Sequence, residues 1–150
     1  MGTHFNGTAK QRRALDAFIK LMRCADAVTG RLAGSFRAGG LTQSQFGILE
    51  ALLHLGPMHQ KELGRKLLKS SGNITVVVDH LEQRGLVRRR QDRNDRRFTT
   101  ISLTAAGRRL IDQAFPIHVE LIIEEFSRLS ILEQEQLAAI CRKLGVIDSG

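Results

Sequence analysis

Arginines are concentrated in one stretch of the chain, residues 84–109. The stretch holds nine arginines against two aspartates, whereas the whole chain of 150 residues carries 23 Lys and Arg against 15 Asp and Glu, a net charge of +8. A guanidinium group donates hydrogen bonds from a planar fork that fits phosphate oxygens and the edge of guanine better than an ammonium group does. Because a solvated surface normally mixes both signs of charge, the stretch predicts a polyanionic partner.

A second group of side chains suited to nucleic acid lies just before the arginines, on a helix that we expect to start at Ser70. The apolar residues of 74–81 recur at steps i, i+3, i+4 and i+7, so they would face a core, although the run 74–78 also has the β-branched content of a strand. Hydroxyl and amide groups can bind phosphates or base edges, and methyl groups can contact the methyl of thymine. The residues expected on the outward face are Ser71, Asn73, Thr75, Val76, Asp79 and His80.

Three helices are predicted before this one. Apolar residues at three- and four-residue steps indicate a long amphipathic helix over residues 10–37. Thr42 and Gln45 have the spacing of a capping box, so a second helix should begin there and end at Gly56. A short third helix is expected over residues 59–68.

A basic β-hairpin is predicted next, with strands at residues 86–91 and 98–103 and a polar tip between them. The order helix, short helix, helix and basic hairpin is that of a winged helix-turn-helix. In that fold the last helix lies in the major groove of DNA, and the hairpin reaches the backbone or the minor groove. We therefore expect double-stranded DNA as partner. The residues expected to contact it are Lys69, Ser70, Ser71, Asn73, Thr75, Val76, His80, Arg88, Arg89, Arg90, Arg93, Arg96 and Arg97.

Within the tip of the hairpin, Asp95 is expected to pair with Arg97 and so to hold the shape of the loop. Arg96, or Arg93 beside it, is expected to enter the minor groove. The arginines at positions 88–90, together with Lys69, are expected to contact phosphates.

Two further helices are predicted to complete the chain. Thr104 can cap a helix that runs to residue 129 and that Pro116 must kink or split. Ser130 with Glu133 forms a second capping box, which would open the last helix.

Several motifs in the middle of the chain carry a family resemblance. The most specific are GNIT at residues 72–75, the V-D-x-L-E-x-x-G-L-V run at 78–87, and D-R-R at 95–97 ahead of an L-T at 103–104. With them, the stretch from Leu41 to Leu110 resembles the MarR (multiple antibiotic resistance regulator) family. The resemblance implies an obligate homodimer whose first and last helices interlock. It also implies a transcriptional regulator, usually a repressor, that binds pseudo-palindromic promoter DNA and is released by a small ligand or by oxidation.

The predicted fold class is mainly α with a small β-hairpin wing, in one chain with two lobes. Residues 41–104 would form the winged helix-turn-helix lobe that binds DNA. Residues 10–38 and 105–147 hold more apolar surface than a winged helix can cover, so a helical dimerisation lobe is expected there. A two-fold dimer would place two recognition helices roughly 34–36 Å apart, one turn of DNA.

Four residues are expected to line an effector pocket, because the resemblance places their helices around a ligand cleft between the lobes. They are Arg23, His54, Phe115 and His118. We expect a small-molecule effector and no cofactor. A metal-responsive regulator that uses His54, His118 and a carboxylate is an alternative. Cys24 is expected to be a small core residue rather than a redox sensor.

Catalysis and membrane insertion are disfavoured by what the sequence lacks. There is no G-x-S-x-G, no Gly-rich phosphate loop and no H-E-x-x-H motif, and no apolar run approaches the roughly 18 residues of a membrane span. The first residues lack the apolar core of a secretory signal, so a cytoplasmic location is expected. Two alternatives stay open, which are an architectural DNA-binding protein of low specificity without effector, and a winged helix that binds protein.

Overall fold

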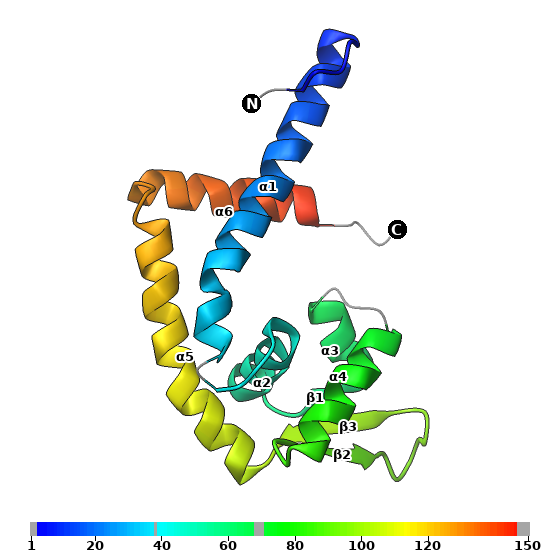
Figure 1. Cartoon of the computed structure of the whole chain (residues 1–150). Helices are drawn as coiled ribbons and strands as arrows, with labels where there is room; N and C mark the ends of the chain where they lie inside the picture. The colour runs from blue at the N-terminus through cyan, green and yellow to red at the C-terminus, as the bar shows by residue number, and fades with distance from the viewer. Residues whose placement is uncertain (1–2, 38, 68–70, 147–150) are drawn as a thin grey trace.

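The computed structural model describes residues 3–37, 39–67 and 71–146. Its helices and strands are α1 (Ala9–Arg37), α2 (Gln43–Leu55), β1 (Met58–His59), α3 (Gln60–Lys66), α4 (Ser71–Gln83), β2 (Val87–Gln91), β3 (Thr99–Leu103), α5 (Ala105–Phe126) and α6 (Ile131–Gly145). Figure 1 shows α2, α3, α4 and the strands gathered in one lobe, with α1 and α5 running from that lobe toward α6. The prediction of a mainly α fold with a small β wing is confirmed.

The predicted helix starts after Thr42 and Ser130 are confirmed by capping boxes at both. Thr42 Oγ1 accepts from the Gln45 N–H at 3.2 Å, and Gln45 Oε1 accepts from the Thr42 N–H at 3.0 Å. Ser130 and Glu133 make the same reciprocal pair. These bonds satisfy N–H groups that lack a partner in the first turn of a helix. Helix α2 ends at Gly56, whose φ of 80° is a left-handed conformation that glycine adopts without strain.

The β-branched run at residues 74–78 lies within helix α4, as its periodicity predicted and its strand propensity did not. Ile74, Val77, Val78 and Leu81 are all buried. Intrinsic propensity differs by only about 0.7 kcal/mol per residue between ordinary residues, which is less than the stabilisation gained by burying a branched side chain. The tertiary packing of one face therefore decides that this segment is helical.

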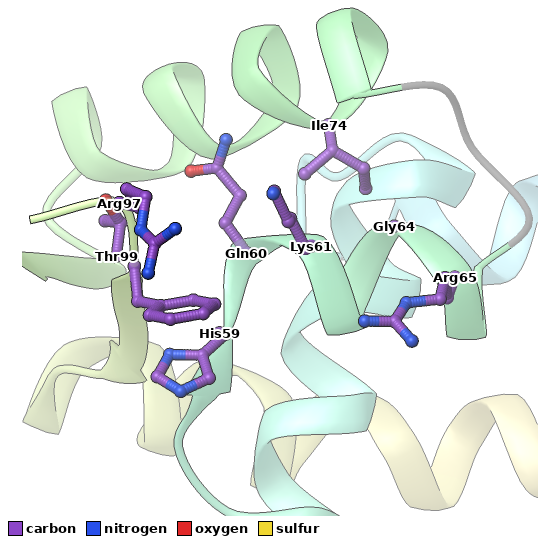
Figure 2. A pocket seen from close by; sticks show the side chains of 9 residues that line it. His59, Gln60, Lys61, Gly64, Arg65, Ile74, Arg97 and Thr99 are labelled. Carbon is purple, nitrogen blue, oxygen red and sulfur yellow. The ribbon is translucent and has the colours of Figure 1, made fainter. Parts of the chain in front are cut away.

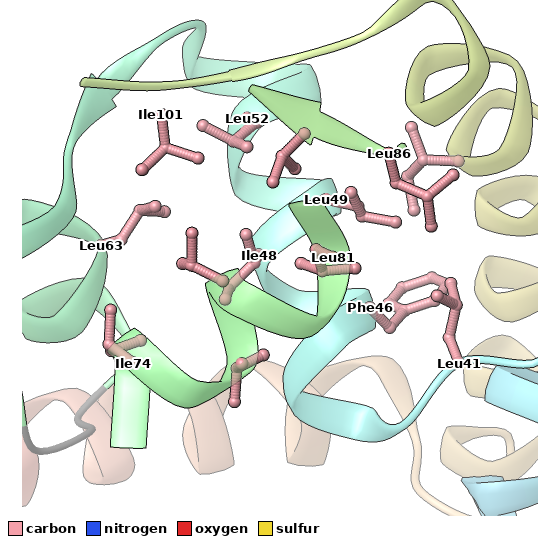
Figure 3. Packing of buried hydrophobic residues seen from close by; sticks show 14 of the residues in the cluster. Leu41, Phe46, Ile48, Leu49, Leu52, Leu63, Ile74, Leu81, Leu86 and Ile101 are labelled. Atoms are coloured by element: carbon pink, nitrogen blue, oxygen red, sulfur yellow. The ribbon is translucent and has the colours of Figure 1, made fainter. Parts of the chain in front are cut away.

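The core lies within the lobe built around α2 and α4. Phe46 and Leu49 of α2, Leu63 of α3, Leu81 of α4 and Ile101 of β3 are each at most 1% exposed. Figure 3 shows these side chains pointing toward one another from their separate elements. Full burial of one such side chain contributes about 1.5–3 kcal/mol to stability. The elements expected to contact DNA are thus fixed to one shared core.

The sheet has three antiparallel strands in the order β1-β3-β2, one strand more than the predicted hairpin. Strand β1 pairs Met58 with Ile101 and His59 with Thr100. Two residues are too few to show the alternation that identifies a strand in a sequence. This short strand attaches the hairpin to the segment between α2 and α3.

Helix α5 is continuous through Pro116, so the proline does not split it, and Figure 1 shows the helix changing direction near its middle. At its start, Thr104 Oγ1 accepts from the Gly107 N–H at 3.0 Å, as the predicted cap requires. The Thr104 N–H donates to the Leu86 carbonyl at 3.1 Å. A Cβ at Gly107 would overlap that same carbonyl oxygen. The glycine therefore allows α5 to lie directly against the backbone that leads into β2.

The helices outside this lobe leave large apolar side chains exposed in the single protomer. Helix α1 is joined to α5 by an ion pair of 2.8 Å between Arg31 Nε and Glu125 Oε1. No described residue of α6 is buried. The exposed apolar residues on α1, α5 and α6 are Phe18, Leu21, Met22, Ile117, Ile123, Ile131, Leu132, Ile140 and Leu144.

Cys24 and Cys141 are both exposed and not linked in a disulfide. The expectation that Cys24 is a core residue is wrong for the protomer, because the apolar side of α1 is only partly covered within one chain. Among the described residues, none of the helices combines the length and the apolar character needed to cross a membrane.

Candidate nucleic-acid interface

The outward face of α4 carries the side chains that the sequence assigned to base contacts. Asn73, Thr75, Val76 and His80 are exposed, Val76 to 52%, because they lie opposite the buried face of the helix. This face presents an amide, a hydroxyl, methyl groups and an imidazole, all of which can bind base edges in a major groove. The expected contacts of Lys69, Ser70 and the Ser71 side chain lie outside the described residues.

Thr75 is also linked to the preceding helix. Gln60, the first residue of α3, donates from Nε2 to Thr75 Oγ1 at 2.9 Å. The two helices of the helix-turn-helix are therefore joined by a polar contact on the exposed side as well as by the core. Nothing in the sequence pattern distinguished Gln60 from other surface residues.

The three consecutive arginines of β2 do not share one environment. Successive side chains of a strand point to opposite faces. Arg88 and Arg90 are exposed, whereas the side chain of Arg89 is only 24% exposed and lies on the same face as the buried Val87. Two of the three arginines predicted to contact phosphates are thus exposed to solvent, and the side chain of the third points toward α4.

Arg89 is engaged with two carboxylates of helix α4. Its Nη1 lies 2.6 Å from Asp79 Oδ1 and 3.5 Å from Glu82 Oε1. Its backbone N–H donates to Glu82 Oε2 at 3.1 Å. The expected contact of Arg89 with a phosphate stays a prediction, but here its guanidinium group connects the wing to the recognition helix.

The tip of the wing is shaped by aspartates. Arg97 Nη2 lies 2.7 Å from Asp95 Oδ2, and the Arg97 backbone N–H donates to Asp95 Oδ1 at 3.1 Å. These hydrogen bonds from Arg97 lower the pKa of the Asp95 carboxyl. Asp92 Oδ1 accepts from the Asn94 N–H at 2.8 Å. The expected pairing of Asp95 with Arg97 is present, and it fixes the turn that carries the exposed Arg96.

Not every arginine of the basic stretch serves the outer surface. Arg84 donates from Nη1 to the Gly40 carbonyl at 2.9 Å and from Nη2 to the Gly39 carbonyl at 3.2 Å. It therefore braces the turn between α1 and α2. Arg93, at the wing tip, is exposed.

His118 lies at the junction of the two lobes. Its ring is 5.0 Å from that of Phe36 on α1 and 4.6 Å from that of Phe46 on α2, between ring centroids. Burial lowers the pKa of the imidazole, and the Glu50 carboxylate acts weakly in the opposite direction. The three rings and Glu50 line a cavity of about 300 Å³ that is also bordered by Gln43, Ser44, Gly47 and Leu67.

The other expected effector residues do not line this cavity. The rings of His54 and Phe115 pack on each other at 4.6 Å, in a separate contact between α2 and α5. Arg23 is exposed on α1. In the described parts of the chain, no group of three or more His, Cys, Asp or Glu side chains is placed to hold a metal ion.

A larger cavity, of about 440 Å³, lies between residues 97–99 at the start of β3, helix α3 and the start of α4. Figure 2 shows Lys61 and Arg65 on α3, Arg97 and Thr99 of the wing, and Ile74 at the start of α4. The rings of His59 and Phe98 face each other at 5.0 Å. No local sequence pattern predicts this cavity, because its walls come from β1, α3, α4, β3 and the loop before β3, whose relative placement depends on the fold.

Comparisons with known proteins agree with this geometry. The sequence profile of the MarR family matches residues 41–99. Over 134 residues the chain is 34% identical to the HTH-type transcriptional regulator MhqR of Bacillus subtilis, and the alignment covers 89% of this chain and 92% of MhqR. A probable transcriptional regulator from Pseudomonas aeruginosa has a similar crystal structure, with a TM-score of 0.72, 31% identity and coverage of 83% of this chain and 96% of the other.

A likeness of fold extends to a structure solved with DNA. A cysteine-to-serine mutant of MarR from Escherichia coli, in complex with operator DNA, superposes with a TM-score of 0.73 at 23% identity, covering 85% of this chain and 95% of the other.

Proposed function

Since this chain belongs to the MarR family of transcriptional regulators, we propose that it is a repressor that binds a pseudo-palindromic operator as a homodimer and leaves it when a small molecule or an oxidant acts on the protein. The chain is a DNA-binding regulator and not an enzyme.

The observation that carries the proposal is the shared direction of the α4 outer face and the wing tip. In Figure 1 the loop between β2 and β3 extends past α4 on the side where α4 is free of other elements. Arg93 and Arg96 are exposed on that loop. With α4 in a major groove, the loop would reach the neighbouring minor groove, where an arginine side chain is attracted by the negative potential.

The homodimer is supported by the apolar surface that one protomer leaves uncovered. Helices α1, α5 and α6 expose nine large apolar residues, such as Leu132 and Ile140, and α6 buries none. So many large exposed apolar residues on three helices favour a protein interface. A two-fold axis would bring two recognition helices to successive turns of one DNA face, which a pseudo-palindromic operator matches.

A small-molecule effector is supported by the cavity beside His118. Its volume of about 300 Å³ is at the lower end of the range for ligand pockets. It is bordered by α1, α2 and α5, so a ligand there would touch both lobes. His118 is the expected effector residue that we retain at this cavity, while Arg23, His54 and Phe115 do not border it.

The experiment that tests DNA binding is a footprint of the purified protein on the DNA upstream of its own gene, followed by a salt titration. A specific regulator should bind its operator about 10³-fold or more tightly than random DNA, and an architectural protein should not. Arg96→Ala should weaken operator binding and reduce the slope of log K against log salt by about one unit. A wild-type slope in that variant would show that the wing assignment is wrong.

Arg12→Ala is the matched control, because it removes the same charge from the exposed N-terminal part of α1, far from the wing. It should leave both the operator affinity and the salt slope unchanged. Loss of the footprint on adding metabolites, phenolics or oxidants would identify the effector class. A regulator acts where the chromosome lies, so the cytoplasm of a bacterial cell is the proposed location.

A further inference from the structure

The wing and the recognition helix are held together by the shared apolar core, which includes Leu81, Val87 and Ile101, and by polar contacts beside it. A cavity of about 440 Å³ lies between α3, Ile74 and residues 97–99 at the start of β3, and residues 97–99 are not part of the apolar core. Apolar contacts bind surfaces without fixing a direction, whereas hydrogen bonds between charged groups impose one. The angle between the outer part of the wing and the helix therefore depends also on the polar contacts beside the core.

Those contacts converge on Arg89. One guanidinium nitrogen, Nη1, lies 2.6 Å from Asp79 and 3.5 Å from Glu82, which are neighbours on one side of α4, three positions apart. The Arg89 N–H is bound to the same Glu82 carboxylate at 3.1 Å. A side chain and its own backbone are thus both fixed to α4. Thr75, one turn before Asp79, is in turn bound by Gln60 of α3.

The ion pairs of Arg89 with Asp79 and Glu82 contribute little to the stability of the fold. The Asp79 and Glu82 side chains are 45% and 44% exposed, so solvent screens both ion pairs. Exposed ion pairs stabilise a fold only slightly. Arg90, the next residue of the strand, is fully on the outer face and serves as the natural comparison.

We propose that Arg89 is a positioning residue for DNA recognition, which sets the wing against the recognition helix through Asp79 and Glu82 instead of contacting a phosphate itself. The inference rests on the proposed function, since it concerns how two DNA-contacting parts are aligned. The contacts of Arg89 with Asp79 and Glu82 fix the wing relative to α4. The helix can then lie in the major groove while the wing tip enters the neighbouring minor groove of the same DNA.

Two substitutions with opposite effects on net charge separate this role from a phosphate contact. Arg89→Gln removes a positive charge, and Asp79→Asn removes a negative one. If only charge mattered, Asp79→Asn would strengthen DNA binding. Positioning predicts that each variant weakens operator binding by about tenfold and that the double variant is no worse than either single one, as for residues that act through one contact.

The salt dependence and the choice of DNA provide the second readout. Arg89→Gln should keep the wild-type salt slope and the wild-type affinity for random DNA. Arg90→Gln, the matched control, should lose about one unit of slope and weaken operator and random DNA alike. Arg89→Lys, which keeps a charge that can reach one carboxylate, should recover part of the operator affinity. The thermal midpoint of each variant should lie within about 4 °C of wild type.

Hydrogen exchange without DNA tests the same claim independently of the proposed function. Amides of the wing, residues 88–99, should exchange faster in Arg89→Gln and in Asp79→Asn, while those of α2 and α3 stay protected. The proposal is overturned if Arg89→Gln loses a unit of salt slope, if Asp79→Asn binds the operator as tightly as wild type, or if wing exchange is unchanged. Failure of wild type to discriminate operator from random DNA would instead refute the proposed function.

Discussion

The two lobes of this chain differ in how completely each buries its own apolar side chains. In the winged helix-turn-helix lobe, Phe46, Leu49 and Leu81 are at most 1% exposed and no partner is needed to cover them. In the helical lobe, Leu132, Ile140 and their neighbours remain in solvent. The winged lobe covers its own core, whereas the helical lobe leaves an apolar surface that the partner of the proposed homodimer would cover. Their stabilities should therefore respond differently to protein concentration.

The largest expected effect concerns the core of the winged helix-turn-helix lobe, which we call the closed core because one chain covers it completely. Leu81→Ala removes a side chain that is 0% exposed, and should lower the free energy of unfolding by about 2–5 kcal/mol. Urea unfolding at several protein concentrations measures it, and the loss should be the same at each. Ile123→Ala is the counterpart, because Ile123 is 56% exposed in the protomer. If its cost does not depend on concentration, the contrast between the lobes is wrong.

Next comes the open apolar surface of α6. Ile140→Glu introduces a charge where we propose a protein interface, and should convert the dimer to monomers in light scattering. Loss of two-site binding should weaken operator affinity by about 100-fold. Ala138→Glu adds the same charge about 200° around the helix axis from Ile140. That control should remain dimeric, and a dimer in both variants would place the interface elsewhere.

A smaller effect is expected at the two capping boxes. Thr42→Ala should cost about 1 kcal/mol at any protein concentration, since α2 belongs to the closed core. Ser130→Ala removes the same kind of cap from α6, which buries nothing in the protomer. Its cost should appear in the dimer equilibrium, measured by sedimentation, and not in the unfolding of the winged lobe. Equal effects of both substitutions on the lobe would contradict the comparison.

The smallest expected effect is a pH dependence at the junction of the lobes. Because burial lowers the pKa of His118 below its ordinary value of 6.5, the unfolded chain binds the proton more readily. The stability is therefore fully present above pH 6.5 and falls as the pH drops toward the folded-state pKa. His118→Gln should reduce the loss of stability on acidification. Urea midpoints between pH 7.5 and pH 5.5 measure this loss, because the range spans roughly one unit either side of the histidine pKa in the unfolded chain.

The sequence predicts a helix or strand well where the residues that stabilise it lie close together within that same segment. The capping boxes at Thr42 and Ser130 are complete within four residues, and the helical period of 74–81 reflects burial of one face. Strand β1 gave no signal, since Met58 and His59 acquire strand geometry only from β3. The sequence therefore predicts an element when its stabilising hydrogen bonds lie within the same segment of the chain.

The candidate site was harder to predict because its side chains depend on neighbours distant in sequence. Arg88, Arg89 and Arg90 are identical in type, so their residue type alone predicts a phosphate contact for all three. Side chains of a strand alternate between its two faces, so an apolar Val87 on the inner face predicts that Arg89 also points inward. The pocket residues had no such signal, because the separation of Arg23 from the cavity depends on the path of α1.

Gly107 has a consequence for how a distant event would reach the DNA. With no side chain between the first turn of α5 and the Leu86 carbonyl, the two backbones meet without a compressible layer. A shift of the first turn of α5 would therefore displace the Leu86 backbone, which leads into β2 and the wing. In the proposed dimer, a small change in the slope of two long helices would set the span between the paired wings.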